Sequence, residues 1–242
     1  MELSIIMRVC NRLEYTIQSI DNIINNTIGD YELIVFNNNS NDWTKERLTW
    51  MKNNIGSNRR DKVIIINSKK NFWDWGWMLE WIKYCKWKYI CQFDNDLLIV
   101  NKWNKFWIWV LENTQYKIVM FKRQWERFEL VESTEEYIEL EWEKIQYGKI
   151  QKPVWCYIML KSLFENCIKT IPANSSWQSK VLLSELVWWN VAKIINKPCK
   201  LMDAWDSPVY REYCDKRVET LRPLVSCLSW EKYPREKNWF YV

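Results

Sequence analysis

The sequence predicts an α/β protein with a doubly wound, mostly parallel sheet and helices on both faces. Two observations lead to this fold class. Four short apolar runs in residues 1–100 alternate with helix-like segments, and polar clusters follow three of these runs. Continuous apolar strands that alternate with helices are typical of parallel sheets covered on both sides. The 242 residues suffice for one large domain, and we expect a single domain with an irregular C-terminal part.

The elements of the first half follow from the spacing of apolar residues. Strands are expected at residues 3–7, 32–36, 63–66 and 89–93, and helices at 13–24, 44–54 and 73–86. Asn11 precedes the first helix as an N-cap residue, and Gly29 ends that unit. In such sheets ligands bind beyond the carboxyl ends of the strands, and Asn11, the loop 37–42 and the segment 94–96 all fall there.

The second half of the sequence is less regular. The charged residues 123–150 predict a hairpin or an excursion from the sheet, and strand-like runs follow at 156–160 and 191–195. A helix is expected over 178–187, and a charged helix from Pro208 leads to a polar, aromatic tail. We find no internal repeat and no low-complexity segment.

Composition argues against several classes of protein. Hydrophobic residues make up 48% and charged residues 27%, as in ordinary soluble domains. The net charge of +5 favours anionic partners such as nucleotides or phospholipid head groups without requiring them. No apolar run approaches the ~18 residues of a membrane span, and the N-terminus lacks the basic region of a signal peptide. The 8 cysteines form no C-x-x-C pair and there is no histidine, so reduced thiols in a cytoplasmic protein are expected.

The segment Asp94-Asn95-Asp96 directly follows a predicted buried strand. Two carboxylates one residue apart can share a hard divalent cation, and that cation can also bind the oxygens of a diphosphate. The alternative is a solvated turn that closes the strand, which is the more common meaning of an isolated Asp-x-Asp. The surrounding motifs favour the metal site, and we expect Asp96→Ala to abolish metal-dependent chemistry without unfolding the protein.

Segments spread over residues 3–100 resemble the motifs of family 2 glycosyltransferases. Residues 4–12, S-I-I-M-R-V-C-N-R, are similar to S-I-I-I-P-x-Y-N-R, and residues 33–44 to L-I-V-V-D-N-G-S-T-D-G-T. Residues 71–73, 80–82 and 86–90 are similar to N-x-G, N-x-G-I and K-G-K-Y-I. Residues 93–96 match the Asp-x-Asp step of the family, and 153–160 resemble its acceptor-side strand, G-G-x-x-M-L-I-R.

The resemblance implies a GT-A fold and transfer of a sugar from a nucleotide-diphosphate donor to an acceptor hydroxyl, usually with inversion and with Mn²⁺ or Mg²⁺. It implies a GT-A-like domain at 1–215, with a nucleotide-binding half at 1–100 and an acceptor half at 101–215, and a helical or extended tail at 216–242. The implied nucleotide-binding residues are Val9, Asn11, Asn37, Asp42, Asn71 and Asp94, and the implied metal ligands are Asp94, Asp96 and Asp203.

The implied partners are a nucleotide-sugar donor and a saccharide or glycolipid acceptor, with no nucleic acid. Such chemistry belongs to the synthesis of cell-surface polysaccharide or glycolipid. It would take place in the cytoplasm, at the inner face of the membrane for an acceptor held there, and would bring peripheral membrane association.

The chain departs from the family pattern at several positions. Asn37 stands where the family has an aspartate that contacts the nucleoside, which keeps hydrogen bonding but removes a charge. Gln178-Ser179-Lys180 stands where the family has the acidic pair with its catalytic base, so the nearest carboxylate, Glu185, is the predicted base. The late histidine that often binds the metal is absent, and Asp203 could replace it as an oxygen ligand.

The sequence contains 19 Trp but only 4 Gly. Trp103 fits as a true tryptophan, but others stand where the family pattern has glycine: Trp43, Trp73, Trp81, Trp87 and Trp155. Neither core packing nor an aromatic platform for sugars explains this pattern, and at Trp43 we expect a turn that favours the positive φ of glycine. We predict that most of these residues are UGA codons that specify glycine. UGG codons at 43, 73, 81 and 87 would contradict this.

Three other functions stay open from the sequence. A nucleotidyltransferase shares the fold and the metal carboxylates, but no glycine-rich phosphate loop follows the first strand. A nucleic-acid-binding module would use the +5 charge and the 16% aromatic residues, but Lys and Arg do not cluster with aromatics on one element. A non-catalytic member of the family is favoured by the missing acidic pair.

Overall fold

The computed structural model describes residues 2–54, 62–72, 76–123, 136–140, 143–149, 156–170 and 191–201. All of them belong to one unit of the chain, Met1–Leu201. The helices expected at 178–187 and from Pro208, and the boundary expected between 215 and 216, lie outside the described residues.

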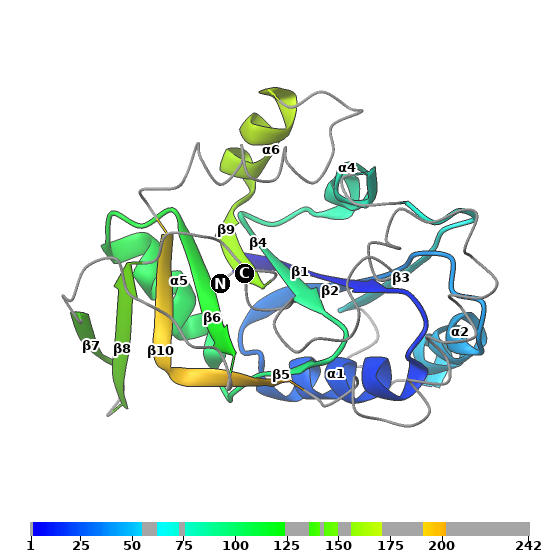
Figure 1. The fold of residues 1–242 in the computed structure, drawn as a ribbon, viewed down its shortest axis with the longest axis horizontal. Coiled ribbons are helices and arrows are strands. Elements are labelled where there is room, and N and C mark those ends of the chain that lie inside the picture. Colours follow the sequence, from blue (N-terminus) through cyan, green and yellow to red (C-terminus); the bar gives the residue numbers. More distant parts are fainter. Residues whose placement is uncertain are drawn as a thin grey trace, which may run out of the picture. The chain divides into compact units, whose positions relative to one another are not determined.

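The first half of the chain forms the parallel part of the sheet, as predicted. Its strands are β1 (Glu2–Val9), β2 (Asp30–Asn37), β3 (Val63–Asn67) and β4 (Tyr89–Asp94), in the order β3-β2-β1-β4 with every pair parallel. The helices between them are α1 (Leu13–Asn26), α2 (Thr44–Asn54) and α4 (Gly76–Trp81), which continues into a short 3-10 helix, η1 (Ile82–Tyr84). Figure 1 shows these four strands side by side.

The second half extends the sheet mainly by antiparallel pairing. Its elements are β5 (Leu97–Leu98), α5 (Trp103–Asn113), β6 (Ile118–Arg123), β7 (Glu136–Leu140), β8 (Glu143–Lys149), β9 (Tyr157–Leu160), α6 (Lys161–Thr170) and β10 (Val191–Leu201). From β4 the sheet continues in the order β9-β6-β10-β8-β7. Only the β6–β10 pair is parallel among these, and β7–β8 is the hairpin expected within 123–150. The sheet is therefore mixed, with its parallel part where the sequence placed it.

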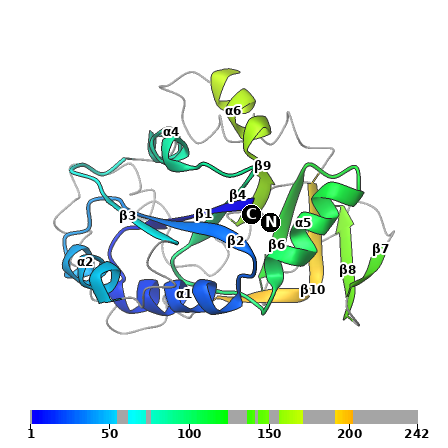
Figure 2. The same cartoon turned by 180° about the vertical axis from the view of Figure 1, so that it is seen from behind.

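Helices cover both faces of the sheet, which confirms the doubly wound fold. Leu3, Ile5 and Met7 of β1 pack in the same buried cluster as the apolar residues of α1, α2 and α5. Ile6 faces the opposite way, in a cluster with residues of α4, η1 and α6. Figures 1 and 2 show α1 on one side of β1–β4 and α4 and α6 on the other. In the described segments no helix is both long and apolar enough to cross a membrane.

The tryptophans that the structure describes differ widely in burial. Trp43 is 77% exposed, whereas Trp81 is fully buried and stacks on Phe164 with ring centroids 5.1 Å apart. Trp103 is also buried, and its indole N–H donates to Thr27 Oγ1 at 2.9 Å. The structure thus gives Trp103 a hydrogen-bonded site that suits a tryptophan, as expected. Trp73 and Trp155 lie outside the described residues.

The backbone corrects one expectation about glycine-like positions. Trp43 does not have a positive φ, so the expectation of a glycine-favouring turn there is wrong. The positive φ in this loop, 60°, belongs to Asn39, which also stands where the family pattern has glycine. Asparagine tolerates this left-handed conformation better than most residues, so the loop forms without glycine. At Gly29 φ is 76°, which confirms its predicted place at the end of the first helical unit.

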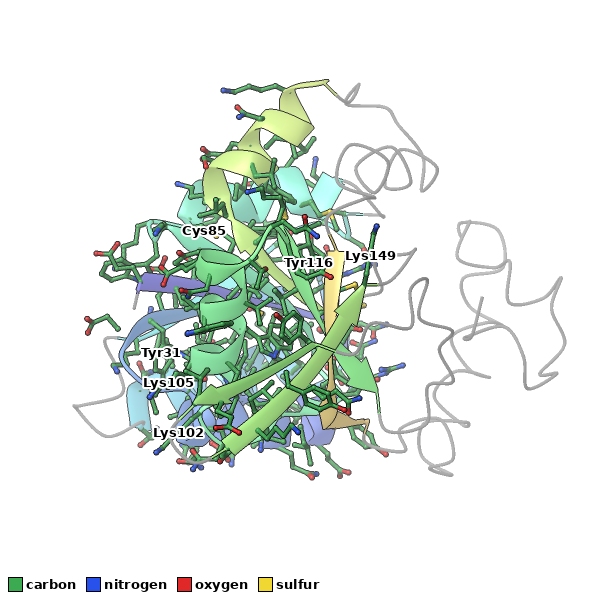
Figure 3. The ribbon with its side chains drawn as sticks, turned by 90° about the vertical axis from the view of Figure 1, so that its left-hand side faces the viewer. Tyr31, Cys85, Lys102, Lys105, Tyr116 and Lys149 are labelled. Carbon is green, nitrogen blue, oxygen red and sulfur yellow. The ribbon has the colours of Figure 1, made fainter. Side chains whose placement is uncertain are left out.

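Four cysteines have described side chains, and none of them forms a disulfide: Cys10, Cys85, Cys91 and Cys156. Burial raises the pKa of the Cys85 thiol, labelled in Figure 3, and that of the Cys91 thiol well above the ordinary value. Cys10 is different, because it lies partly exposed just after β1.

Candidate functional site

The carboxyl ends of three neighbouring strands bring the predicted site residues to one edge of the sheet. In the register of the sheet Val9 at the end of β1 lies opposite Asn37 at the end of β2. On its other side β1 pairs with β4, and Arg8 lies opposite Asp94. The segments that follow these strands therefore start next to each other, as expected for parallel strands.

The turn after β1 has an unusual backbone that its neighbours hold in place. Asn11 and Arg12 are both left-handed, with φ of 60° and 62°, which costs roughly 1–2 kcal/mol per residue. The Asn11 N–H donates to Ser40 Oγ at 2.8 Å, and the Asn41 N–H donates to Asn11 Oδ1 at 2.8 Å. From the β4 side, Asn95 Nδ2 donates to the Asn11 carbonyl at 3.3 Å. The loops after β2 and β4 thus fix the turn after β1.

These contacts correct the role predicted for Asn11 as an N-cap. Arg12 is the N-cap residue of α1, and it makes no side-chain capping hydrogen bond. The Asn11 side chain instead bonds to the loop after β2, at a buried position with 2% exposure. Asn11 therefore joins two loops of the site rather than starting the helix.

Asn37 is bound at both ends of its side-chain amide. Its Oδ1 accepts hydrogen bonds from the Ser40 N–H at 3.0 Å and from the Ser40 hydroxyl at 2.6 Å. Its Nδ2 donates to Asn67 Oδ1, at the end of β3, at 2.9 Å. An aspartate here would have no donor of its own, so the Asn67 amide would have to turn and present its Nδ2 instead. The present orientation of Asn67 therefore matches an asparagine at position 37.

Two more predicted nucleotide-binding residues have structural partners. Asn71 Oδ1 accepts from Asn38 Nδ2 at 2.6 Å, which ties the segment after β3 to the loop after β2. Asp42 Oδ1 accepts from the Thr44 N–H at 2.9 Å, at the first residue of α2. Both therefore shape the edge of the site, whether or not they also contact a ligand.

The two aspartates sit at the end of β4 in different surroundings. Asp94 is the last residue of the strand and is half-buried. Asp96 is only 5% exposed, and its Oδ2 lies 2.8 Å from Arg12 Nη1 in a salt bridge. Between them, Asn95 Nδ2 donates to Thr16 Oγ1 of α1 at 2.8 Å. The structure thus makes the middle residue of the motif an anchor and gives Asp96 a cationic partner.

Sequence reasoning missed Arg12, Asn95 and Thr16. Arg12 ends the motif quoted for residues 4–12, but its pairing with a residue 84 positions away has no signal in the sequence. The Asp-x-Asp pattern assigns no role to Asn95, although a neutral amide beside two carboxylates can both donate and accept hydrogen bonds.

The donor set suits a hard divalent cation only in part. Across the described ranges no group of three or more Cys, Asp or Glu side chains could hold a metal, so Asp94 and Asp96 are two carboxylates without a third. No described residue donates a hydrogen bond to the second oxygen of Asp96, Oδ1. Carboxylate oxygens are ligands that Mn²⁺ and Mg²⁺ accept, and Mg²⁺ usually keeps other positions for substrate phosphates and water. The residues present therefore fit such an ion if other oxygens complete its shell.

Two predicted residues, Glu185 and Asp203, lie outside the described residues. The described chain does return to the site, however. Leu201, the last residue of β10, pairs antiparallel with Leu97, the residue directly after Asp96. Ser19 of α1 holds the same segment, because its hydroxyl donates to the Leu97 carbonyl at 2.8 Å.

The profile of the family described as "Glycosyl transferase family 2" matches residues 4–165. No protein of curated function matches the chain by sequence. Among solved structures, S. aureus TarS 1-349 in complex with UDP-GlcNAc is similar with a TM-score of 0.63 and 13% identity, over 84% of this chain and 59% of that one. A mannosyltransferase from Pyrobaculum calidifontis, PcManGT, in complex with GDP-Man and Mn²⁺, has a TM-score of 0.59 and 10% identity, over 90% and 61%.

At such identities these structures show the fold alone, and they confirm the GT-A-like α/β fold that the resemblance implied. The chain spans about three fifths of the length of these two structures. The family profile covers more than half of this chain and includes β1, the loop after β2 and the Asp94–Asp96 segment. The chain belongs to glycosyl transferase family 2.

Proposed function

We propose that this chain transfers a hexose from a nucleotide-diphosphate sugar to an acceptor hydroxyl, with inversion and with Mn²⁺ or Mg²⁺. The observation that carries the proposal is the network that joins the ends of β1, β2 and β4 through Asn11, Asn37 and Asp96. Related folds add support, since TarS was solved with UDP-GlcNAc and PcManGT with GDP-Man and Mn²⁺. Membership of the family supports the same reaction class.

In this proposal the loops after β1, β2 and β3 hold the nucleoside. Its residues are Val9, Asn11, Asn37, Asp42 and Asn71. Of these, Asn11 and Asn37 are buried and hydrogen-bonded before any ligand binds, so the pocket is preorganised. The ribose or the metal contacts Asp94. No charged side chain replaces the family's aspartate at Asn37, so the base is read by neutral amides, which suit uracil and guanine alike.

The metal is assigned to Asp94, Asp96 and Asp203. A bound Mn²⁺ or Mg²⁺ supplies positive charge to the departing nucleoside diphosphate. Asp203 is assigned from the family resemblance, as an oxygen ligand in place of the late histidine.

Glu185 is assigned as the base that takes the proton of the acceptor hydroxyl. Inverting transfer needs such a group on the face of the sugar opposite the leaving diphosphate. The strand-end residues of the first half are committed to the nucleotide and the metal, so the base comes from the second half. The acceptor is a saccharide or glycolipid for cell-surface polysaccharide or glycolipid synthesis. The protein would act on this acceptor in the cytoplasm, or at the inner face of the membrane, with which it would associate peripherally.

Calorimetric titration with UDP and GDP, with and without Mn²⁺, tests the donor site. We expect binding of at least one nucleotide that depends on the metal, and no comparable binding of a single-stranded oligonucleotide. Donors of the bound nucleotide are then screened for hydrolysis and for transfer. Metal-independent nucleotide binding, or a preference for the oligonucleotide, would show that the proposal is wrong.

A non-catalytic nucleotide-binding protein is the second candidate, because Gln178-Ser179-Lys180 cannot act as the base. Nucleotide binding with intact Mn²⁺ dependence but no hydrolysis or transfer of any donor would favour it. If wild type transfers sugar, Glu185→Gln tests the assigned base: it should remove transfer while nucleotide affinity stays the same.

A further inference from the structure

We propose that Arg12 is a positioning residue of the donor site. It binds one oxygen of Asp96, so that only the other oxygen faces a ligand, and it places a fixed positive charge beside the diphosphate. The inference rests on the proposed function. Its basis is the salt bridge from Arg12 Nη1 to Asp96 Oδ2 at 2.8 Å, between side chains that are only 14% and 7% exposed.

The backbone of Arg12 is fixed as firmly as its side chain. Its left-handed φ of 62° and ψ of 48° is unfavourable for arginine, and the start of α1 gains no side-chain cap from it. The Arg12 carbonyl nevertheless accepts hydrogen bonds from the Thr16 N–H at 3.0 Å and the Thr16 hydroxyl at 2.9 Å. Strain of this kind persists where the surroundings enforce it, and it concentrates at functional sites. Here the enforced turn accompanies the contact to Asp96.

The second oxygen of Asp96 points to the ligand role. Oδ2 is bound to Arg12, while Oδ1 has no donor among the residues that the structure describes. A carboxylate held in this way offers Oδ1 to a cation while Oδ2 already accepts from the guanidinium, which favours binding through one oxygen and leaves other positions of the ion for diphosphate oxygens. Arg12 thereby fixes both the rotation of the carboxylate and the number of oxygens it offers.

Charge predicts opposite effects of Arg12 on the two ligands. Asp94, Asp96 and Arg12 together carry a net charge of −1, and loss of the guanidinium would make it −2. A more negative site binds a free divalent cation more tightly, because repulsion from the guanidinium is gone. The same site binds a nucleoside diphosphate more weakly at saturating metal, because one positive charge beside the phosphates is lost. A purely structural role of Arg12 would weaken both.

The test is Arg12→Gln, with Mn²⁺ binding measured by the electron paramagnetic resonance signal of free Mn²⁺ in the absence of nucleotide. Affinities for UDP and GDP are measured by calorimetry at saturating Mn²⁺. We expect Mn²⁺ to bind about three- to tenfold more tightly and the bound nucleotide about tenfold more weakly. Arg12→Lys, which keeps the charge, is expected to recover nucleotide affinity to within about threefold.

Arg47→Gln is the matched control, because Arg47 is exposed on α2 with its guanidinium 4.0 Å from the ring centroid of Trp50. It should change neither affinity. If wild type binds neither Mn²⁺ nor nucleotide, the proposed function itself fails, and the inference with it. If wild type binds both but Arg12→Gln weakens both with an unchanged circular dichroism spectrum, only the inference is overturned.

Should Arg12→Gln not fold, Arg12→Lys decides by itself. Retained charge predicts Mn²⁺ and nucleotide affinities within about threefold of wild type. A loss of more than about tenfold in both, with wild-type circular dichroism, would overturn a role through charge.

Discussion

The parallel and antiparallel parts of the sheet are built in different ways. In the parallel part, residues just after β1, β2 and β4 bond to each other across 29 to 84 residues of sequence. The antiparallel part contains the β7–β8 hairpin and strand β9, which pairs with β4 on one side and β6 on the other. The difference indicates that the parallel part holds the turn after β1 against the loops after β2 and β4, while the antiparallel part reaches the donor site through the pairing of Leu201 with Leu97. The predictions below test this division.

The largest expected effect is on stability, at the contact between the two parts. Trp81 follows β3 in the chain and stacks on Phe164, which follows β9. Trp81→Gly removes a fully buried indole and should lower the free energy of unfolding by about 3–5 kcal/mol. Trp43→Gly, at a 77% exposed position, should change it by less than about 0.5 kcal/mol. Both are measured by urea denaturation.

The variants Trp81→Gly and Trp43→Gly also test the prediction that UGA codons specify glycine at these two positions. Equal tolerance of glycine at 81 and 43 would contradict the packing seen for Trp81 and would favour the prediction that UGA specifies glycine at both. A large loss at 81 alone would point to a true tryptophan there.

A smaller loss of stability is expected at the donor site, together with complete loss of metal-dependent binding. Asp96→Ala removes the salt bridge to the largely buried Arg12 guanidinium and should cost about 2–3 kcal/mol. The sequence predicts that this variant still folds, and the salt bridge adds the expectation that it is less stable than wild type. Thermal unfolding and Mn²⁺ titration measure the two effects, and unchanged Mn²⁺ binding would place the metal elsewhere.

Asn37→Asp should break the amide network within the parallel part. It removes the donor to Asn67 and buries a charge at a 2% exposed position, at a cost of about 1–3 kcal/mol. Gln18→Glu, an exposed amide-to-acid change on α1, is the control and should be nearly neutral. A rise in stability of Asn37→Asp, measured by denaturation, would contradict the network.

The smallest effect should come from the antiparallel part. Tyr147 of β8 packs edge to face on Tyr116, labelled in Figure 3, with ring centroids 6.1 Å apart. Tyr147→Leu should lower stability by about 1 kcal/mol and leave nucleotide affinity unchanged. A tenfold or larger drop in nucleotide affinity, measured by the same calorimetric titration, would show that the antiparallel part also determines the geometry of the donor site.

The sequence predicted the parallel part of the fold nearly residue by residue. Its strands are continuous apolar runs and its polar clusters follow them, so local pattern and position in the sheet agree. Helix α5 was missed because its aromatic run, Trp103–Asn113, shows no clear polar face, and six of its residues are buried. The place of β9 between β4 and β6 depends on antiparallel pairing with strands distant in the chain, which no local pattern encodes.

The sequence predicted which residues lie at the site, but not which of them contact one another. Short motifs located Asn11, Asn37, Asp94 and Asp96, because strand ends of a parallel sheet converge. The pairing of Arg12 with Asp96 and the anchoring of Asn95 on Thr16 depend on side-chain directions in space. Glu185 and Asp203 stay predictions.

The cysteines offer a built-in reporter of the donor site. Cys85 and Cys91 are buried with raised thiol pKa values, so little thiolate is present at neutral pH and maleimide reagents should label them slowly in the folded protein. Cys10 is partly exposed and adjoins the Asn11–Arg12 turn. Peptide mapping after brief alkylation should find Cys10 modified well before the two buried thiols, and bound nucleotide with Mn²⁺ should slow that modification. The labelling rate of one native side chain would then serve as an occupancy assay that needs no knowledge of the sugar or the acceptor.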